Sequence, residues 1–201
     1  SLLVNYAYQR EASTEFFDDR AGFARDFTWR CRGDSPRHRV NHALSWELPV
    51  GHGRWLLKNA AKPVDLALGG WQLTTTNRWY SGRILQFNQN LIVSGNPKLD
   101  NPTRGRWFDT SLFAALPAGT TNDPANTVRK NPWTYDGLVG PGTSQTDVTL
   151  SKAFRLSERF KLEVRVESYN VFNNLNWDNP VVDFTNANFG KVISKRPGYI
   201  G

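Results

Sequence analysis

The feature that most constrains the fold is a strict alternation of residue types between Asp147 and Glu167. Every second residue is apolar, or is a long side chain with an apolar stem, and the residues between are polar or small. A period of two is the period of a β-strand, whose successive side chains point to opposite faces. A tight turn is expected at 155–159, so the segment predicts a β-hairpin with one wet face and one apolar face. The apolar face would carry Val148, Leu150, Lys152, Phe154, Phe160, Leu162, Val164 and Val166.

Three more segments alternate in the same way. With the hairpin they predict five strands, at about 1–10, 39–49, 71–87, 145–155 and 160–172. Pro49 should end the second strand because proline has no N–H for a ladder, and Gly82 should mark a bulge or bend near the end of the third. Between these two strands, the Gly-bounded connection 50–70 contains PVDLAL, which suggests a short helical turn. The predicted fold class is therefore all-β, an antiparallel up-and-down meander of about five strands.

The connections between these strands are unequal. Residues 11–36 and 88–143 are long and aperiodic and would lie at one end of the meander, whereas the short turn 155–159 would lie at the other. Long loops at one end and short turns at the other are typical of outer-membrane barrels. The aromatic residues near strand ends would suit the two interfacial girdles of such a barrel. They are Trp71, Trp79, Tyr80, Phe154, Phe160, Tyr169 and Phe172.

Two interpretations of the strands stay open at this point. A transmembrane barrel turns its apolar face to lipid and its polar face to the lumen. A soluble β-sandwich, such as a carbohydrate-binding module with exposed Trp, would instead pack Leu162, Val164 and Val166 against a second sheet. No apolar run approaches the ~18 residues that a membrane-spanning helix needs.

The sequence offers no recognisable catalytic, cofactor-binding or metal site, and we expect no enzyme activity and no cofactor. His38 and His42 are four apart, but on a strand rather than a helix, and with His52 they are the only histidines. Cys31 is the single cysteine, so it forms no intrachain disulfide. The net charge of +7 comes from scattered Lys and Arg rather than a basic run, which argues against nucleic acid. On the polar face, Lys161, Glu163, Arg165 and Glu167 favour a hydrated lumen wall over a conduit.

Five segments, in order, resemble Oar-like TonB-dependent transporters. They are ELPVGHGRWLLKNAAKPVDLALGGWQLTTTNRWYSGR (47–83), RWFDTSLFA (106–114), Gly140–Gly142, DVTLSKAFRLSERFKLEVRVESYNVFNNLNW (147–177) and NFGKV (188–192). In that family a similarly long Gly-bounded connection lies at 50–70, and one more strand ending in an aromatic residue would follow residue 201.

The resemblance implies that residues 1–201 are a C-terminal part of a receptor barrel in the bacterial outer membrane, incomplete at both ends and without the plug domain. The absence of Met agrees with a natural start upstream of Ser1. The implied function is uptake of a bulky solute, driven through the TonB system by the missing N-terminal part. Expected partners are outer-membrane lipid, the rest of the barrel and plug, and an unknown solute.

Two sets of residues follow from this interpretation. Val164 and Lys152 should both point to the apolar side, with Val164 near mid-bilayer and Lys152 closer to the periplasmic rim, where its amine reaches the headgroups. Val164→Arg should then impair insertion, while Glu163→Arg is tolerated. If the long loops take part in solute recognition, the candidates are Trp29, Trp107 and Trp133, although loop aromatics also pack on one another.

Overall fold

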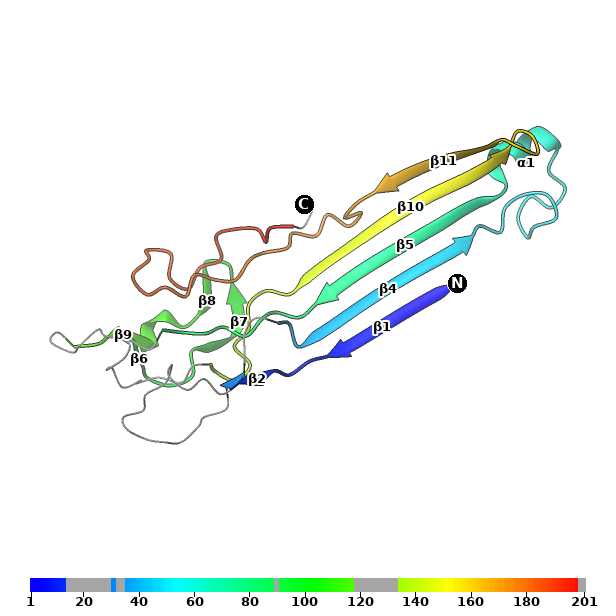
Figure 1. Cartoon of the computed structure of the whole chain (residues 1–201). Coiled ribbons are helices and arrows are strands. Elements are labelled where there is room, and N and C mark those ends of the chain that lie inside the picture. The colour runs from blue at the N-terminus through cyan, green and yellow to red at the C-terminus, as the bar shows by residue number, and fades with distance from the viewer. Residues whose placement is uncertain (14–29, 32–34, 89–90, 118–133, 199–201) are drawn as a thin grey trace.

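The structure is a computed structural model that describes residues 1–13, 30–31, 35–88, 91–117 and 134–198. Its main element is a five-stranded antiparallel sheet in which each strand lies beside the next one along the chain, in the order β1-β4-β5-β10-β11 (Figure 1). The strands are β1 (Leu2–Tyr8), β4 (His38–Glu47), β5 (Trp71–Tyr80), β10 (Thr143–Arg155) and β11 (Lys161–Ser168). The predicted up-and-down meander is therefore confirmed, and the sheet is open, with β1 and β11 as its two edges.

Two predicted strand ends are wrong by several residues. The fifth strand ends at Ser168 rather than residue 172. The third strand ends at Tyr80 rather than Phe87. The reason is a close backbone approach, since a Cβ on Gly82 would lie only 1.8 Å from the Gly140 carbonyl oxygen. Gly82 lies two residues past the end of β5, and beyond it the chain leaves the sheet so that Leu85 and Phe87 become buried elsewhere.

The β4–β5 and β10–β11 connections lie at one end of the sheet, here called the turn end. The β10–β11 turn closes with the Leu156 N–H donating to the Phe160 carbonyl at 3.0 Å. The β4–β5 connection (residues 48–70) contains α1 (Lys62–Leu68), at the position of the predicted helical turn. With Pro at its start, α1 begins where a missing N–H costs nothing. In the part of the chain that the structure describes, no helix is long and apolar enough to span a membrane.

The long connections gather at the opposite end, the loop end (Figure 1). They contain three small two-stranded sheets and a 3₁₀ turn, so the described part of 88–143 has more regular structure than its aperiodic sequence indicated. The pairs are β2 (Ala12–Ser13) with β3 (Arg30–Cys31), β6 (Leu91–Val93) with β9 (Phe113–Ala115), and β7 (Lys98–Thr103) with β8 (Arg106–Phe108), and η1 spans Thr110–Leu112.

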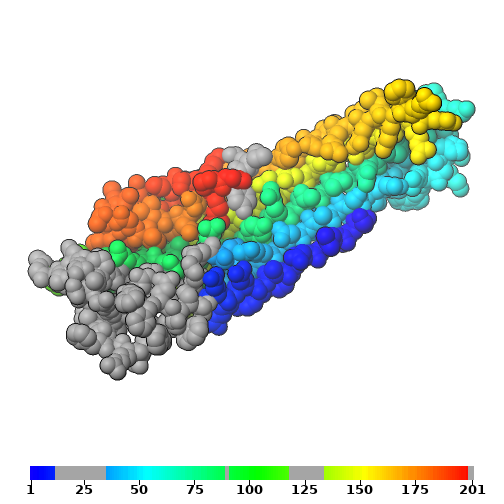
Figure 2. Space-filling view, viewed as in Figure 1, coloured from blue at the N-terminus to red at the C-terminus, as the bar shows by residue number. Residues whose placement is uncertain are grey.

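The hydrophobic core lies at the loop end and not between layers of sheet. The molecule is elongated, with the sheet extending away from a bulkier loop end (Figure 2). Seven buried residues form one cluster, joined by partly buried side chains from 182–189. The segment after β11, residues 169–198, contains no helix or strand and packs onto this cluster through side chains of 182–189. The buried members are Leu85, Phe87, Leu91, Phe108, Phe113, Tyr135 and Leu138.

Candidate functional site

The cross-strand register joins the alternating faces of the five strands into one continuous apolar face. Leu44 lies opposite Leu2 on one side and Thr75 on the other, and Thr75 lies opposite Val148. Residues directly opposite in an antiparallel pair project to the same side, so one set of side chains crosses the whole sheet. Apart from a polar row at His42, Asn77 and Thr146, its middle consists mainly of Leu, Val, Trp and Thr.

This apolar face is bare. Leu162, Val164 and Val166 are 50%, 40% and 60% exposed, so no second sheet covers them within the described residues. The burial that a soluble sandwich requires of these three residues is thus not observed. A contiguous apolar surface of this size is expected to contact lipid or another protein.

Aromatic side chains border the apolar face at both ends. Trp46, Trp71 and Phe154 project from it near the turn end, and Tyr6 and Trp79 project from it near the loop end. Trp and Tyr, with an apolar ring and a polar tip, favour the boundary between hydrocarbon and water. Of the other predicted girdle residues, Tyr80 faces the polar side, Phe160 lies in the turn, and Tyr169 and Phe172 follow β11.

The opposite face is polar and holds ion pairs. Arg165 lies between two carboxylates on its own strand, 3.2 Å from Glu163 and 3.3 Å from Glu167, while Arg78 is 3.8 Å from Asp147. The strand β11 is exposed along its whole length. Exposed pairs of this kind contribute little stability, and they suit a hydrated wall.

Lys152 and Val164 share the apolar face, as predicted, but Val164 does not lie at the predicted depth. The register places them directly opposite each other, and Lys152 is also opposite Trp71, the first residue of β5. Both therefore lie near the turn end, and the mid-bilayer position assigned to Val164 is wrong. A tight turn centred near residue 158 forces this pairing, because residues equidistant from the centre of a hairpin face each other.

The Lys152 amine is buried rather than extended into open surroundings. Lys152 is 6% exposed, and its Nζ donates to the Leu66 carbonyl at 2.5 Å and lies 3.4 Å from the Asp65 carbonyl oxygen. Nζ also lies 5.0 Å from the centroid of the Phe154 ring. The carbonyls of α1, at the negative end of its dipole, take the place expected for lipid headgroups.

At the loop end, aromatic rings hold together segments far apart in the sequence. The Phe87 and Phe108 rings meet edge to face at 5.2 Å, and Phe108 also contacts Phe189 at 5.2 Å. Edge-to-face contacts add about 0.5–1.5 kcal/mol to burial alone. The described residues 81–88, 91–117, 134–142 and 169–198 thus form one packed unit, here called the loop cluster.

Backbone contacts tie the last segment to the cluster. The Trp107 N–H donates to the Gly190 carbonyl and the Val192 N–H to the Arg104 carbonyl, both at 2.8 Å. The Arg104 guanidinium lies 3.6 Å from the centroid of the Trp177 ring. The apparently irregular segment 169–198 is therefore fixed by specific partners.

The loop cluster has a cavity of about 520 Å³. At its wall, the Thr185 hydroxyl and N–H donate to Asp183 at 2.7 and 2.9 Å, and the side-chain bond first, then the backbone bond, lowers the pKa of Asp183 below its ordinary value. The wall thus presents apolar side chains and a carboxylate. The residues that matter here are Asn88, Leu91, Leu116, Val182, Asp183 and Phe184.

Of the three Trp residues predicted as candidates for solute recognition, the structure describes one. Trp107 lies in the loop cluster, packed against the core, with its indole N–H donating to the Val139 carbonyl at 2.8 Å, so it has a structural role. Trp29 and Trp133 lie outside the described residues. The cavity residues were not predicted, because nothing in the sequence indicates that Asn88 and Leu91 lie near 182–185.

The histidines do not come together in a metal site. His38 Nδ1 is 2.9 Å from the Tyr6 hydroxyl, and His38 begins β4 whereas His52 lies in the connection after its opposite end. Over the described ranges, no group of three or more His, Cys, Asp or Glu side chains could hold a metal ion.

The comparisons with known proteins agree with this geometry. A family model described as an outer membrane beta barrel domain matches residues 1–199. No curated protein and no solved structure shows significant similarity to the chain. The family match, the bare apolar face with aromatic borders and the polar opposite face support one assignment. The chain belongs to the outer membrane β-barrel domain family, and its place is the bacterial outer membrane.

Proposed function

We propose that this chain forms part of the barrel wall of a TonB-dependent transporter that takes up a bulky solute, rather than an enzyme. The five motifs between residues 47 and 192 support the Oar-like family within the broader barrel family. In this proposal the turn end is periplasmic and the loop end extracellular, as the lengths of the connections favour. The plug and the TonB-contacting segment would belong to the part of the protein that precedes Ser1.

The observation that carries the proposal is the loop cluster. A barrel that only has to close needs short connections, whereas here long segments enclose an aromatic core and a cavity of about 520 Å³. Loops held rigidly on a scaffold are the usual place for ligand contacts. The cavity wall combines apolar side chains with few polar groups, as ligand sites commonly do. A bulky solute would contact this wall together with loops from the rest of the barrel.

The first test concerns TonB. The full-length protein is purified in detergent, and its binding to the purified periplasmic domain of TonB from the same host is measured. Saturable binding is expected, and it should be lost when the segment upstream of the plug is deleted. Absence of binding by the folded full-length protein would contradict the TonB part of the proposal.

The second test distinguishes a plugged transporter from an open pore. Liposomes containing the full-length protein are placed in solutions of small sugars, and swelling is followed by light scattering. A plugged barrel should swell no faster than empty liposomes, and a variant without the plug should swell rapidly. Rapid swelling with the intact protein would indicate a porin and would refute a gated transporter.

A further inference from the structure

The β4–β5 connection (residues 48–70) exposes more apolar side chains than a solvated turn requires. Trp55 is 83% exposed and Leu66 is 63% exposed. In α1 only Lys62 and Asp65 are charged, and none of its residues is buried. A helix that is apolar around most of its surface is normally covered by apolar surroundings. The other exposed apolar residues of the connection are Leu56, Leu57, Val64 and Leu68.

Hydrogen bonds and a required glycine fix the backbone that carries these side chains. Asp65 turns its carboxylate back to accept a hydrogen bond from the His52 N–H, which ties α1 to the first half of the connection. A Cβ on Gly51 would lie 2.5 Å from the same carboxylate oxygen, and Gly51 has φ of +125°, so only glycine fits there. The Leu56 N–H donates to the Pro49 carbonyl at 2.8 Å and closes the first half of the connection.

Leu57 has a strained backbone conformation although its side chain is not buried. It adopts φ of +61°, in the left-handed region, and it remains 46% exposed. A non-glycine residue in this conformation costs on the order of 1 kcal/mol or more. Asn or Gly would be the relaxed choice for a solvated turn.

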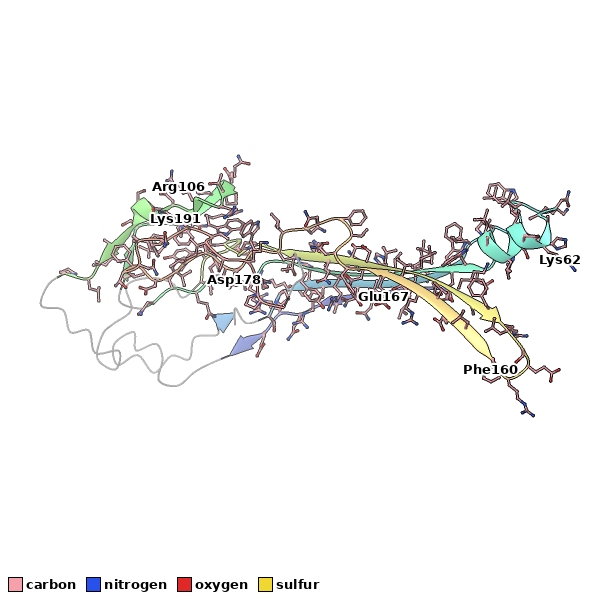
Figure 3. All side chains as sticks on the ribbon, turned by 90° about the horizontal axis from the view of Figure 1, so that it is seen from above. Lys62, Arg106, Phe160, Glu167, Asp178 and Lys191 are labelled. Carbon is pink, nitrogen blue, oxygen red and sulfur yellow. The ribbon has the colours of Figure 1, made fainter. Side chains whose placement is uncertain are left out.

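The connection continues the apolar face of the sheet. Lys152 and Trp71 both project from that face at the turn end, and both bond to α1, through the Leu66 and Ala67 carbonyls respectively. Seen from above, α1 lies just beyond the end of β5, and the β10–β11 hairpin curves away from it (Figure 3). Since the apolar face is the lipid-facing side of an outer-membrane barrel, α1 lies on the lipid-facing side at the membrane boundary.

The charges of the connection suit an anionic lipid surface. Residues 48–70 contain three basic side chains (Arg54, Lys58 and Lys62) and one acidic side chain (Asp65), a formal charge of +2 with histidine neutral. Arg54 also pairs with Glu47, the last residue of β4, at 3.1 Å, and both side chains of this pair are exposed. Basic and Trp side chains beside exposed leucines are the composition of interfacial membrane anchors. Juxtamembrane basic residues are attracted to anionic headgroups.

We propose that the β4–β5 connection is an interfacial anchor that inserts α1 and Trp55 into the periplasmic leaflet of the outer membrane, with its basic side chains among anionic phospholipid headgroups. Phospholipid is the single occupant that the apolar surface, its continuity with the lipid-facing sheet and its positive charge all favour. The inference rests on the outer-membrane location and on the periplasmic placement of the turn end in the proposed function, and it is independent of TonB-dependent transport.

The test places a fluorophore on the anchor of the full-length protein. In a Cys31→Ser background, Leu66→Cys or Leu68→Cys is labelled with an environment-sensitive dye. The protein is reconstituted in phosphatidylethanolamine liposomes with or without phosphatidylglycerol, in which some lipids carry a nitroxide near the headgroup. Ala153→Cys, exposed on the polar face near the same end of the sheet, is the matched control.

Labels at both anchor positions should emit at shorter wavelength than the Ala153 label and lose emission to the nitroxide lipids. The Ala153 label should be unquenched. Adding phosphatidylglycerol should deepen the quenching, and the combined change Arg54→Gln, Lys58→Gln and Lys62→Gln should remove that increase. Quenching at the anchor no greater than at Ala153, in protein that is folded by gel mobility, would overturn the proposal and leave the surface to a periplasmic protein. Quenching that phosphatidylglycerol does not change would overturn the role given to the basic side chains.

Discussion

Arginine at Leu44 should destabilise the barrel far more than arginine at the adjacent Ala43. Depth in the membrane can be worked out from β5, on which Trp71 and Trp79 mark the two borders of the apolar face. They are eight residues apart, or about 26 Å along a strand, and a tilt of about 40° reduces this to about 20 Å across the membrane. Thr75 lies midway between them, and Leu44 is directly opposite Thr75. Leu44 is therefore near the midplane.

The expected magnitude follows from that depth. Arginine on the lipid face costs about 2–4 kcal/mol at the midplane, which corresponds to about a 30-fold to 1,000-fold loss in the folding equilibrium constant. Ala43 lies on the polar face beside Leu3 and Thr76, so arginine there faces water. At Val164, near the turn end, the cost should fall to about 0–1 kcal/mol. The earlier expectation that Val164→Arg is strongly damaging is replaced by this smaller effect, whereas Glu163→Arg should still be tolerated.

The assay is reversible guanidinium unfolding of the full-length protein in liposomes, with gel mobility to check assembly in cells. Leu44→Arg and Ala43→Arg share a strand and differ by one residue, so their difference reports the face and not the local strand propensity. Equal losses of stability for the two variants would refute the assignment of the faces. A greater loss for Ala43→Arg would mean that the faces are reversed.

Three further outcomes concern the loop cluster. Phe108 is fully buried, so Phe108→Ala should remove about 3–5 kcal/mol from the cluster and make it sensitive to limited proteolysis while the barrel still assembles; unchanged protease resistance would contradict the role of this core. Gly82→Ala should lower the thermal midpoint, because its Cβ would meet the Gly140 carbonyl, whereas Gly105→Ala meets nothing within 4 Å and should not. The bonds from the Ser111 hydroxyl, from Arg106 and from the Ser111 N–H lower the pKa of Asp109 below 3.8. Because the folded-state pKa is the lower one, its stabilisation is present above pH 3.8 and is lost as pH falls below it; proteolysis of the cluster should rise there, and Asp109→Asn should flatten that rise.

The sheet could be predicted from sequence because its signal repeats. A period of two over many residues assigns each side chain to a face, and β4, β5 and β10 each start or end within two residues of prediction at their turn ends. The PVDLAL helix was also found, since Pro63 and the flanking glycines delimit it. These signals are local, so one sequence is enough to read them.

Depth and register were less accessible. The face of Val164 was predicted correctly, but its depth was not, since depth depends on which residue stands opposite. The end of β5 was missed for a related reason. The contact between Gly82 and Gly140 joins positions far apart in the chain, and no local pattern reports it.

The loop cluster was the least predictable part. Phe108, Phe113 and Phe189 converge from two segments without periodicity, because their positions are set by tertiary packing. The cavity was also not predictable, because one side comes from residues 88, 91, 115 and 116 and the other from 182–185. The aromatic residues of 88–143 are visible in the sequence, but their spacing does not distinguish a packed core from an exposed binding surface.

Lys152 links the barrel wall to the interfacial anchor. A lysine on the lipid-facing side needs partners for its amine, and at this depth it has carbonyl oxygens of α1 and the rings of Phe154 and Trp71, 5.0 and 5.9 Å away. Without the amine, those carbonyls would lose a hydrogen-bond donor. Without α1, the amine would be a buried cation in apolar surroundings. The amine and α1 therefore stabilise each other. Since Lys152 is fixed in the ladder of β10, it also fixes the depth of α1 relative to the wall. A connection that only joined two strands would not need this bond, whereas one that must hold apolar side chains at a constant level in the leaflet does.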